Sequence, residues 1–492
     1  MRKTLIFLIA LMMVLSAVPA SAAADEDSDI LFIGTALPSG YCCYIGEYGF
    51  DYVSSPDGVP EGNGYVYYDA ETSTVTMHGL VIPYGEYVER PLFESDRSFT
   101  LVLEGDSRVG DENSRFGCPL ASISGGGTLT VKGSGSLTFI CCDDYYSYDY
   151  IIGYWDYDDI DSTVFPSLAI EGGTLTIDAS GPYIFSVIEI ENYEQSAGVF
   201  NVTLNATDYS LVGVMNTDNF SMSGGSLRID NGCEDLGHPA IKCFESFGMS
   251  GGDMQLKSAG YGITLFCDAS FSGGTLEVTG RAPAGNDDRW KCKSAIWISR
   301  GFDLTVSGGN ITVPDADFEY GILAEYDHEE WVAPPKDATS VRFTGGSHEI
   351  TGYGSAVCIE GDVAFAAGTV HLSSETGPAI ITAKGIFLEG NAAFTDEALR
   401  VIGVADLSAS TVPVGSEAMW SVYDHELDPG IGTSAAAQAA VRDLTVKGTQ
   451  VPETVPSGNP PTGVPSASLL YVLILVCVSV IYAAYRRLRP AA

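Results

Sequence analysis

The sequence predicts an all-β fold, a right-handed parallel β-helix solenoid with coils of about 22 residues. The first observation is a repeat: segments 239–256 and 261–278 align without a gap. Ile241 therefore falls on Ile263. The second is the alternation of apolar and polar residues after each glycine pair, which is typical of strands with one buried side. The third is composition, since 56 glycines, 26 tyrosines and 21 phenylalanines against 24 lysines and arginines fit an all-β body.

The repeat extends over most of the chain. An apolar residue stands ten positions before a small pair at Val187/Ala197, Val214/Gly224, Ile241/Gly251, Ile263/Gly273, Val357/Ala367 and Ile380/Gly390. Ile296 stands twelve positions before Gly308, which predicts a two-residue insertion in that coil. The glycine-pair half recurs alone at Gly126, Gly172 and Gly345, and glycine suits a turn that needs positive φ.

Local patterns predict the elements that surround the coils. Residues 24–98 are expected to form an N-terminal leader and cap, with a β-hairpin over 65–79 that turns at 70–73. The parallel β-helix is expected over 99–395, and residues 396–448 are expected to form a C-terminal cap. Insertions between coils are expected at 141–166, 281–294 and 325–340.

The N-terminus has the three parts of a secretory signal peptide, which we place at 1–23. Arg2 and Lys3 form the basic start, an apolar run follows, and Ala20 and Ala22 frame a small-residue cleavage site. An uncleaved membrane anchor is the alternative. Either predicts that the body of the protein lies outside the cell.

The C-terminus predicts a membrane attachment. Residues 466–485 are apolar enough for a transmembrane helix, and the basic residues of 486–492 mark the cytoplasmic side. Residues 449–465 form a Pro/Gly linker before it, which the prolines keep extended. These features predict a single-pass surface protein with its body outside.

The linker also contains a short motif, Asn459-Pro460-Pro461-Thr462-Gly463. With the apolar stretch and the arginines that follow, it resembles the cell-wall sorting signals that sortases cleave between threonine and glycine. Its leading asparagine departs from the commoner leucine. Covalent wall attachment and a simple membrane anchor both remain open.

Charge and cysteine content limit the partners. The net charge of −40 repels polyanions, which disfavours nucleic acids and polyuronates as partners. The alternative is that this charge only keeps the protein soluble or suits salty surroundings. Ten of the eleven cysteines lie outside the predicted span. They can form disulfides outside the cell or remain buried thiols, and no CxxC pair indicates a zinc site.

One family resemblance covers about residues 60–400. A Tyr-Asp-Ala-Glu-Thr hairpin, a Leu-Val-Leu-Glu-Gly strand and repeated Ser-Gly-Gly-Thr-Leu-Thr-Val units resemble secreted microbial proteins described as carbohydrate-binding domain-containing, with a pectate-lyase-like β-helix. In that family the carbohydrate-binding description implies little about mechanism, and the preferred interpretation is a non-enzymatic surface protein, adhesin-like or carbohydrate-binding, displayed on the β-helix. The alternative is a surface polysaccharide hydrolase or lyase. Coil motifs specify the fold better than the ligand.

The residues give little support to catalysis. Acidic and histidine residues that superficially resemble a polygalacturonase-type set occur at Asn216, Asp218, Glu234, Asp235 and His238, but their spacing does not fit neighbouring coils. Asp218 is expected to face solvent in a coil turn. A lyase would need a cationic base, and only Arg228 and Lys242 lie near the centre. His348 and His371 are expected to be exposed. No catalytic residue and no metal site is assigned.

The acidic, aromatic segment 141–161 is the candidate ligand site. It interrupts the coil register and holds six tyrosines, one tryptophan and seven aspartates. Aromatic rings stack on sugar faces, while carboxylates accept sugar hydroxyls or could coordinate Ca²⁺, the one cofactor considered. The expected site residues are Tyr145, Tyr146, Tyr154, Trp155, Asp156, Asp158 and Asp159. The alternative is that these rings only cover the open side of the helix. The sequence names no ligand beyond surface glycans or other extracellular molecules.

Overall fold

The structure is a computed structural model. It describes residues 30–46, 50–83, 90–111, 115–142, 150–153, 165–181, 186–206, 213–233, 238–281, 292–314, 317–325, 338–359, 361–375, 379–382, 385–389, 392–394, 411–413 and 443–448. The chain divides into two compact units, Met1–Gln450 and Val451–Ala492, and the described residues all belong to the first. The expected signal peptide, linker, sorting motif, transmembrane helix and basic tail lie outside the described residues. Among the described residues, no helix is long and apolar enough to cross a membrane.

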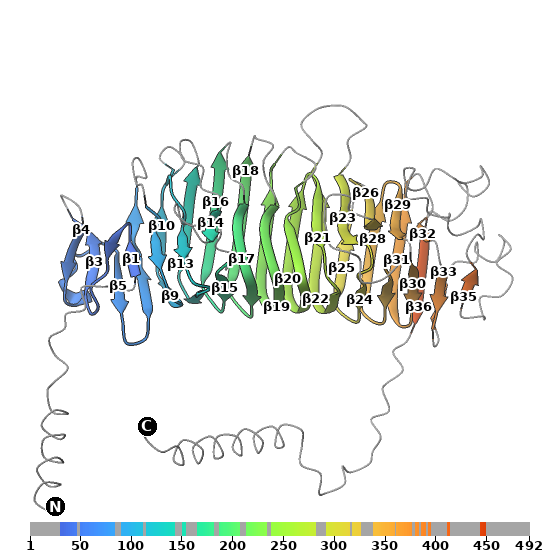
Figure 1. The fold of residues 1–492 in the computed structure, drawn as a ribbon, viewed down its shortest axis with the longest axis horizontal. Helices are drawn as coiled ribbons and strands as arrows, with labels where there is room; N and C mark the ends of the chain where they lie inside the picture. The colour runs from blue at the N-terminus through green and yellow to red at the C-terminus, as the bar shows by residue number, and fades with distance from the viewer. Residues whose placement is uncertain are drawn as a thin grey trace, which may run out of the picture. The chain divides into compact units, whose positions relative to one another are not determined.

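The described part of the first unit is all-β, with one short 3-10 helix, η1 (Pro56–Gly58). Its strands form one large, mostly parallel sheet, and they follow one another along the stack in chain order (Figure 1). The hydrogen-bonded pairs sort into three rows, because each strand pairs with the strands one coil before and one coil after it. This arrangement is consistent with the predicted solenoid.

Most strands belong to a single row. Row 1 contains β8 (Phe93–Ser95), β11 (Ala121–Ile123), β14 (Tyr150–Gly153), β21 (Tyr261–Leu265), β23 (Cys292–Ser299), β26 (Phe318–Glu325), β29 (Ser355–Ile359) and β32 (Ile380–Thr382). Row 2 contains β6 (Thr74–His78), β9 (Phe99–Glu104), β12 (Thr128–Gly133), β15 (Ser167–Ile170), β24 (Leu304–Val306), β27 (Val341–Phe343), β30 (Asp362–Phe365) and β33 (Gly385–Leu388). Row 3 contains β7 (Val81–Ile82), β10 (Asp106–Val109), β13 (Ser136–Cys142), β16 (Thr174–Gly181), β18 (Val199–Ala206), β25 (Asn310–Val313), β28 (Ser347–Gly352) and β31 (Gly368–Ser374).

Four long central strands continue from one row into the next. They are β17 (Ser186–Gln195), β19 (Gly213–Asn231), β20 (Ile241–Ser258) and β22 (Ala269–Gly280). β19 and β20 pass through all three rows, β17 through rows 1 and 2, and β22 through rows 2 and 3. One turn of the chain therefore runs through row 1, row 2 and row 3 before it returns to row 1.

The 22-residue register is confirmed where the sequence repeat is clearest. Ile241 pairs with Ile263, and further along the same two coils Leu256 pairs with Val278. The two-residue insertion is also confirmed. Ile263 pairs with Ile296, but Ala269 pairs with Leu304, so the offset between the two coils grows by two residues.

Between β19 and β20 the predicted register is wrong by one residue. Met215, rather than Val214, pairs with Ile241. The shift is corrected a few residues later, because Thr217 pairs with Cys243 while Asn219 pairs with Ser246. β20 thus carries one extra residue opposite Asp218, the count that defines a β-bulge.

The core lies between the three rows. Inward-facing residues alternate with outward ones, and one contiguous cluster of buried apolar residues runs from Ile30 to Val446. In row 2 the buried rings of Tyr193, Phe220 and Phe247 stack in register, with centroids 5.0 and 4.7 Å apart. Coil stacking thus buries a continuous core that no single coil could form.

Glycine forms the turn between rows 2 and 3. Gly274 has φ +83, and a Cβ there would lie 2.6 Å from the carbonyl oxygen of Gly252 in the preceding coil. Gly252, Gly309 and Gly346 repeat the positive φ at the same turn. The Gly-Gly motif therefore marks a place where the left-handed backbone and close coil stacking both exclude a side chain.

The ends of the stack are closed by antiparallel strands. At the N-terminal end, β1 (Ile30–Phe32) pairs with β2 (Thr35–Ala36) and β8, and β3 (Cys42–Ile45) pairs with β4 (Phe50–Val53) and β5 (Tyr65–Asp69). At the other end, β35 (Thr411–Pro413) pairs with β33, and β36 (Asp443–Gly448) pairs with β31 and β34 (Ala393–Phe394). Antiparallel additions of this kind cover the open edges of a parallel stack.

The predicted hairpin is confirmed, with Tyr65 opposite His78 and Asp69 opposite Thr74. Its second strand, β6, also pairs in parallel with β9. The parallel stacking therefore begins at Thr74, before the expected start at residue 99. The expected cap hairpin is itself part of the first coil.

Candidate functional site

The expected site residues, Tyr145, Tyr146, Tyr154, Trp155, Asp156, Asp158 and Asp159, lie outside the described residues. The segment around them is nevertheless not one continuous insertion, because β14 lies within it. β14 pairs with β11 and β17 as a regular strand of row 1, with Ile152 opposite Ile188. Its two isoleucines supply the buried positions that a row strand needs. β14 therefore lies beside the N-terminal half of β17.

From β17 onward, the outward side of row 1 carries a line of polar and aromatic residues. Register places one residue from each of five successive coils in the same outward column: Glu189, Asn216, Lys242, Thr264 and Trp297. The neighbouring outward positions hold Asp218, Phe244 and Phe266. We call these eight residues the outer strip. Its character changes along the stack, from acidic at β17 to aromatic at β21 and β23.

Hydrogen bonds order the acidic end of the outer strip. The Asn216 side-chain amide donates to Glu189 Oε2 at 2.7 Å and to Ser186 Oγ at 3.0 Å. Burial raises the pKa of Glu189, although hydrogen bonds from Asn216 and Ser186 and the nearby Lys242 ammonium oppose the rise. Glu189 is thus a carboxyl group poised to hold a proton at higher pH than an exposed glutamate.

Asp218 lies at the bulge. Burial raises its pKa, and the carboxylates of Glu245 and Glu191 raise it further. The expectation that Asp218 faces solvent in a coil turn is wrong, because it is half-buried within β19. The bulge places both Phe244 and Glu245 opposite it, so one extra residue brings a ring and a carboxylate to the same point.

The aromatic end is built from stacked rings and one cation. The rings of Phe244 and Phe266 stack with centroids 5.5 Å apart and planes 14° apart, and Trp297 lies 5.2 Å from Phe266. Lys242 Nζ lies 4.9 Å from the centroids of both phenylalanine rings. This geometry is that of a cation–π contact, and it joins the acidic end to the aromatic end.

Two buried polar atoms of the outer strip have no hydrogen-bond partner within the described structure. They are Asn216 Oδ1 and Thr264 Oγ1, on side chains that are 1% and 8% exposed. Native structures rarely leave such atoms unpaired, so each calls for a water or a ligand group. The strip can therefore offer hydrogen bonds to hydroxyl groups beside rings that present an apolar face.

The remaining residues of the suspected hydrolase set do not join the outer strip. Glu234 and Asp235 lie outside the described residues, and His238 lies at the corner between rows 3 and 1. Its backbone carbonyl accepts a hydrogen bond from Asn231 at 3.0 Å. Arg228, on row 3, is also on a different row from Lys242.

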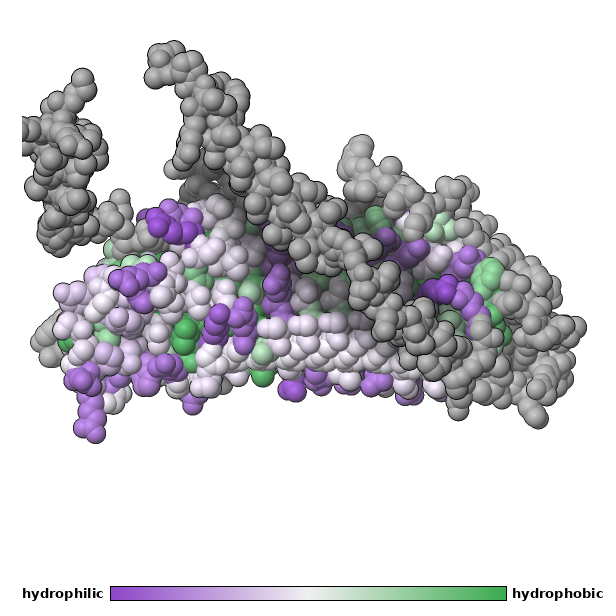
Figure 2. All heavy atoms as spheres, turned by 90° about the horizontal axis from the view of Figure 1, so that it is seen from below, coloured by the Kyte–Doolittle hydropathy of each residue, from purple (hydrophilic) through white to green (hydrophobic). Residues whose placement is uncertain are grey.

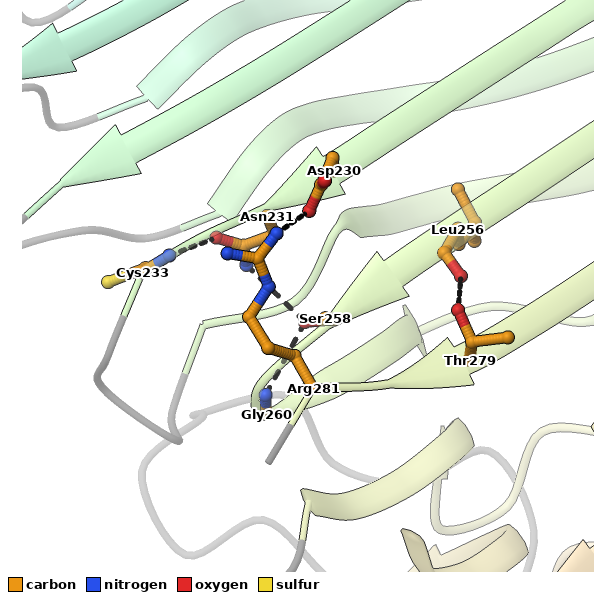
Figure 3. Close-up of polar contacts among 8 residues, drawn as sticks. All are labelled: Asp230, Asn231, Cys233, Leu256, Ser258, Gly260, Thr279 and Arg281. Carbon is orange, nitrogen blue, oxygen red and sulfur yellow. Dashed lines mark hydrogen bonds and ion pairs between the residues drawn. The ribbon is translucent and has the colours of Figure 1, made fainter. Parts of the chain in front are cut away.

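The corner itself is a structural polar network (Figure 3). Asn231 Oδ1 accepts the Cys233 amide at 3.0 Å, and Ser258 Oγ accepts the Gly260 amide at 3.4 Å. Arg281 forms an ion pair with Asp230 and so ties coils together. These contacts pair the side chains of Asn231, Ser258 and Arg281 with groups of the protein, which gives this corner a structural role in holding coils together.

His348 is buried, so the expectation that it is exposed is wrong. It takes an inward position of row 3, between Ile311 and Val370, and is 2% exposed. The Ile311 amide donates to Nδ1 at 3.2 Å, and Nε2 lies 2.7 Å from the Gly345 carbonyl oxygen. A neutral ring protonated on Nε2 satisfies both contacts. Burial lowers its pKa, which keeps the ring neutral.

Row 3 carries an open groove on its outward side, with a volume of ≈ 510 Å³. Its lining includes Asp253, Thr275, Glu277, Asn310 and Glu349 and contains no phenylalanine, tyrosine or tryptophan. Figure 2 shows pale and purple residues over most of the described surface in that view, with green residues in small patches. The described residues include no group of three or more His, Cys, Asp or Glu that could hold a metal ion.

Comparisons of the chain with protein-family models, curated proteins and solved structures found no match. The outer strip was missed at the sequence level because outward positions have no apolar periodicity. The available signal was weak: Phe244 and Phe266 are an outward aromatic pair that repeats at 22 residues.

Proposed function

We propose that the protein is a surface-displayed, adhesin-like glycan-binding protein that binds sugars at the outer strip. The observation that carries the proposal is the combination, within the outer strip, of stacked rings with buried polar atoms that lack partners in the described structure. Phe244 and Phe266 offer apolar area for a sugar face, although Phe266 is largely buried. Asp218, Glu189 and Asn216 offer acceptors to sugar hydroxyls.

We further infer that the three rows wind as a right-handed parallel β-helix, because connections between parallel strands are right-handed in almost all proteins. A pectate-lyase-like solenoid of this kind is a rigid scaffold, and rigid scaffolds hold binding residues in fixed positions. The fold alone does not name the ligand. The ligand class rests on the outer strip.

The proposal places the body outside the cell, after removal of signal peptide 1–23. A transmembrane helix over 466–485 then holds it at the surface, or a sortase joins it to the wall at Thr462. Membrane and glycans are the proposed partners, and nucleic acid is not one. The net charge of −40 supports this choice, because it repels phosphate chains.

The aromatic segment on either side of β14 belongs to the same proposal. β14 and β17 are paired neighbours in row 1, so Tyr154 and Trp155 follow directly after a strand that adjoins Glu189. We propose that these two residues contribute to the same ligand site. Asp156, Asp158 and Asp159 would form a polar rim, with or without Ca²⁺.

A glycan array with the 24–448 fragment tests the proposal, because this fragment keeps every described strand. We expect Phe244→Ala and Asp218→Asn to weaken binding by about tenfold or more each. The control is Glu277→Gln in the row 3 groove, which should leave binding unchanged. Circular dichroism must show that all variants are folded.

Each outcome of the array is informative. Unchanged glycan affinity in both outer-strip variants would remove the strip from the proposal. If Trp155→Ala abolishes binding while the strip variants do not, the segment around β14 is the site by itself. Loss of binding with a chelator would show that Ca²⁺ takes part.

One observation favours polysaccharide hydrolysis as a second candidate function. Glu189 and Asp218 lie on neighbouring coils and both have raised pKa values, as a general acid requires. Reducing-end release by the same fragment tests it. Release that disappears in Glu189→Gln would establish a hydrolase, whereas binding without release would leave a lectin-like protein.

A further inference from the structure

Two buried thiols meet directly beneath the outer strip. Cys243 lies on β20 between Lys242 and Phe244, and Cys267 follows Phe266 in the next coil. Their side chains are 0% and 1% exposed, and both belong to the main core cluster. The Sγ atoms are 3.8 Å apart.

The stacking of the coils holds the two cysteines together. The Phe266 amide donates to the Cys243 carbonyl oxygen at 2.8 Å, and Cys243 pairs with Leu265. Cys267 Sγ also lies 3.9 Å from that carbonyl oxygen. Stacking of the two coils therefore brings Cys267, two residues after the partner of Cys243, next to Cys243.

We propose that Cys243 and Cys267 form a disulfide that joins two neighbouring coils under the outer strip. A disulfide has an S–S distance of about 2.0 Å, so the sulfurs must approach by slightly less than about 2 Å. The two residues lie on neighbouring coils with their Sγ atoms already 3.8 Å apart, and rotation of the two side chains can supply such a shift. The expected secretion of the chain into an oxidising compartment agrees with this proposal.

The reaction is thiol–disulfide exchange with an external small-molecule disulfide. The thiolate of one cysteine attacks that disulfide, forms a mixed disulfide and releases one external thiol. The thiolate of the second cysteine then attacks the mixed disulfide, the S–S bond between the two coils forms, and a second external thiol leaves. Two S–H bonds of the protein are lost, and the external disulfide takes up the two electrons and two protons.

Burial decides when the exchange occurs. The pKa of Cys267 is raised, first by its hydrogen bond with Cys243 and then by burial, so the folded protein holds little thiolate at neutral pH. Exchange is therefore expected while the coils assemble. Once formed, the bond is shielded from reductants and fixes the two strands that carry the stacked Phe244 and Phe266 rings.

Disulfide mapping on the full chain tests the proposal. The protein is purified without reductant, incubated with oxidised glutathione during refolding, denatured with an alkylating agent and digested. We expect a cross-linked peptide pair that contains residues 243 and 267 and separates on reduction. Alkylation of both residues as free thiols, or linkage of either to a different cysteine, would overturn the proposal.

Thermal unfolding provides the second measurement. In the unsubstituted protein, reductant present during refolding should lower the Tm by several degrees. The conservative variants Cys243→Ser and Cys267→Ser cannot form this disulfide. Reductant should therefore lower their Tm less than it lowers the Tm of the parent protein. An equal response to reductant in the variants and the parent would contradict the bond. Mapping of the parent protein still decides the question if a variant fails to fold.

Discussion

A side chain at the turn between rows 2 and 3 should destabilise the stack, and Gly274→Ala tests this directly. Gly274 has φ +83, where an L residue costs about 1–2 kcal/mol. Its new Cβ would lie 2.6 Å from Gly252 O and 2.8 Å from Gly251 C. Both are backbone atoms of the preceding coil, so relief requires the coils to separate. Overpacking of this kind costs about 1–3 kcal/mol more.

We therefore expect Gly274→Ala to lower the free energy of unfolding by about 2–5 kcal/mol, measured by urea denaturation. Gly248→Ala is the matched control, because it lies on β20 and its Cβ would meet nothing closer than Phe220 O at 3.8 Å. It should be neutral or stabilise by up to about 1 kcal/mol, since glycine weakens a strand. Equal losses in the two variants would refute the argument that the turn requires glycine.

Four further results are expected. The buried, neutral His348 has a lowered pKa, so the free energy of unfolding should fall as the pH drops below 6.5, the pKa of the unfolded histidine. His348→Gln should make this fall shallower, and an unchanged pH profile of stability in this variant would contradict the prediction. Lys242→Met should cost about 0.5–1 kcal/mol by losing the cation–π contact, and a neutral effect in low salt would count against that contact. Ile263→Asp should cost on the order of 4 kcal/mol or more, since Ile263 is 1% exposed; a folded variant of parental stability would disprove its inward position. Deletion of 464–492 should release the protein into the medium, and retention on cells would exclude this segment as the anchor.

The parts of the fold that could be predicted are those governed by local pattern. Ile241 and Ile263 are inward residues of successive coils, and burial selects apolar residues at each such position. The same selection makes Leu256 and Val278 recur, so register is visible in one sequence. The hairpin over Tyr65–His78 was predictable for the same reason, because alternation and a polar turn define it.

Single polar residues at inward positions were not predictable. His348 replaces an apolar residue in its column, and only its contacts with Ile311 and Gly345 explain how a core tolerates it. Sequence pattern assigns a histidine to the surface. A buried histidine with both ring nitrogens paired is an exception that depends on tertiary contacts.

The outward residues of the candidate site were not predictable from sequence pattern either. Outward residues are not selected for apolar character, so Glu189, Asn216 and Lys242 carry no periodic signal, although register aligns them in one column. The extra residue of β20 opposite Asp218 is what brings Phe244 and Glu245 to one point, and it follows from comparing two coils. Because β20 and β21 then continue at a constant offset, the bulge acts once, and the rings of Phe244 and Phe266 stack regularly beyond it. An acidic end and an aromatic end therefore meet at one of the places where the stack changes its register, and this is where we propose that the outer strip binds its ligand.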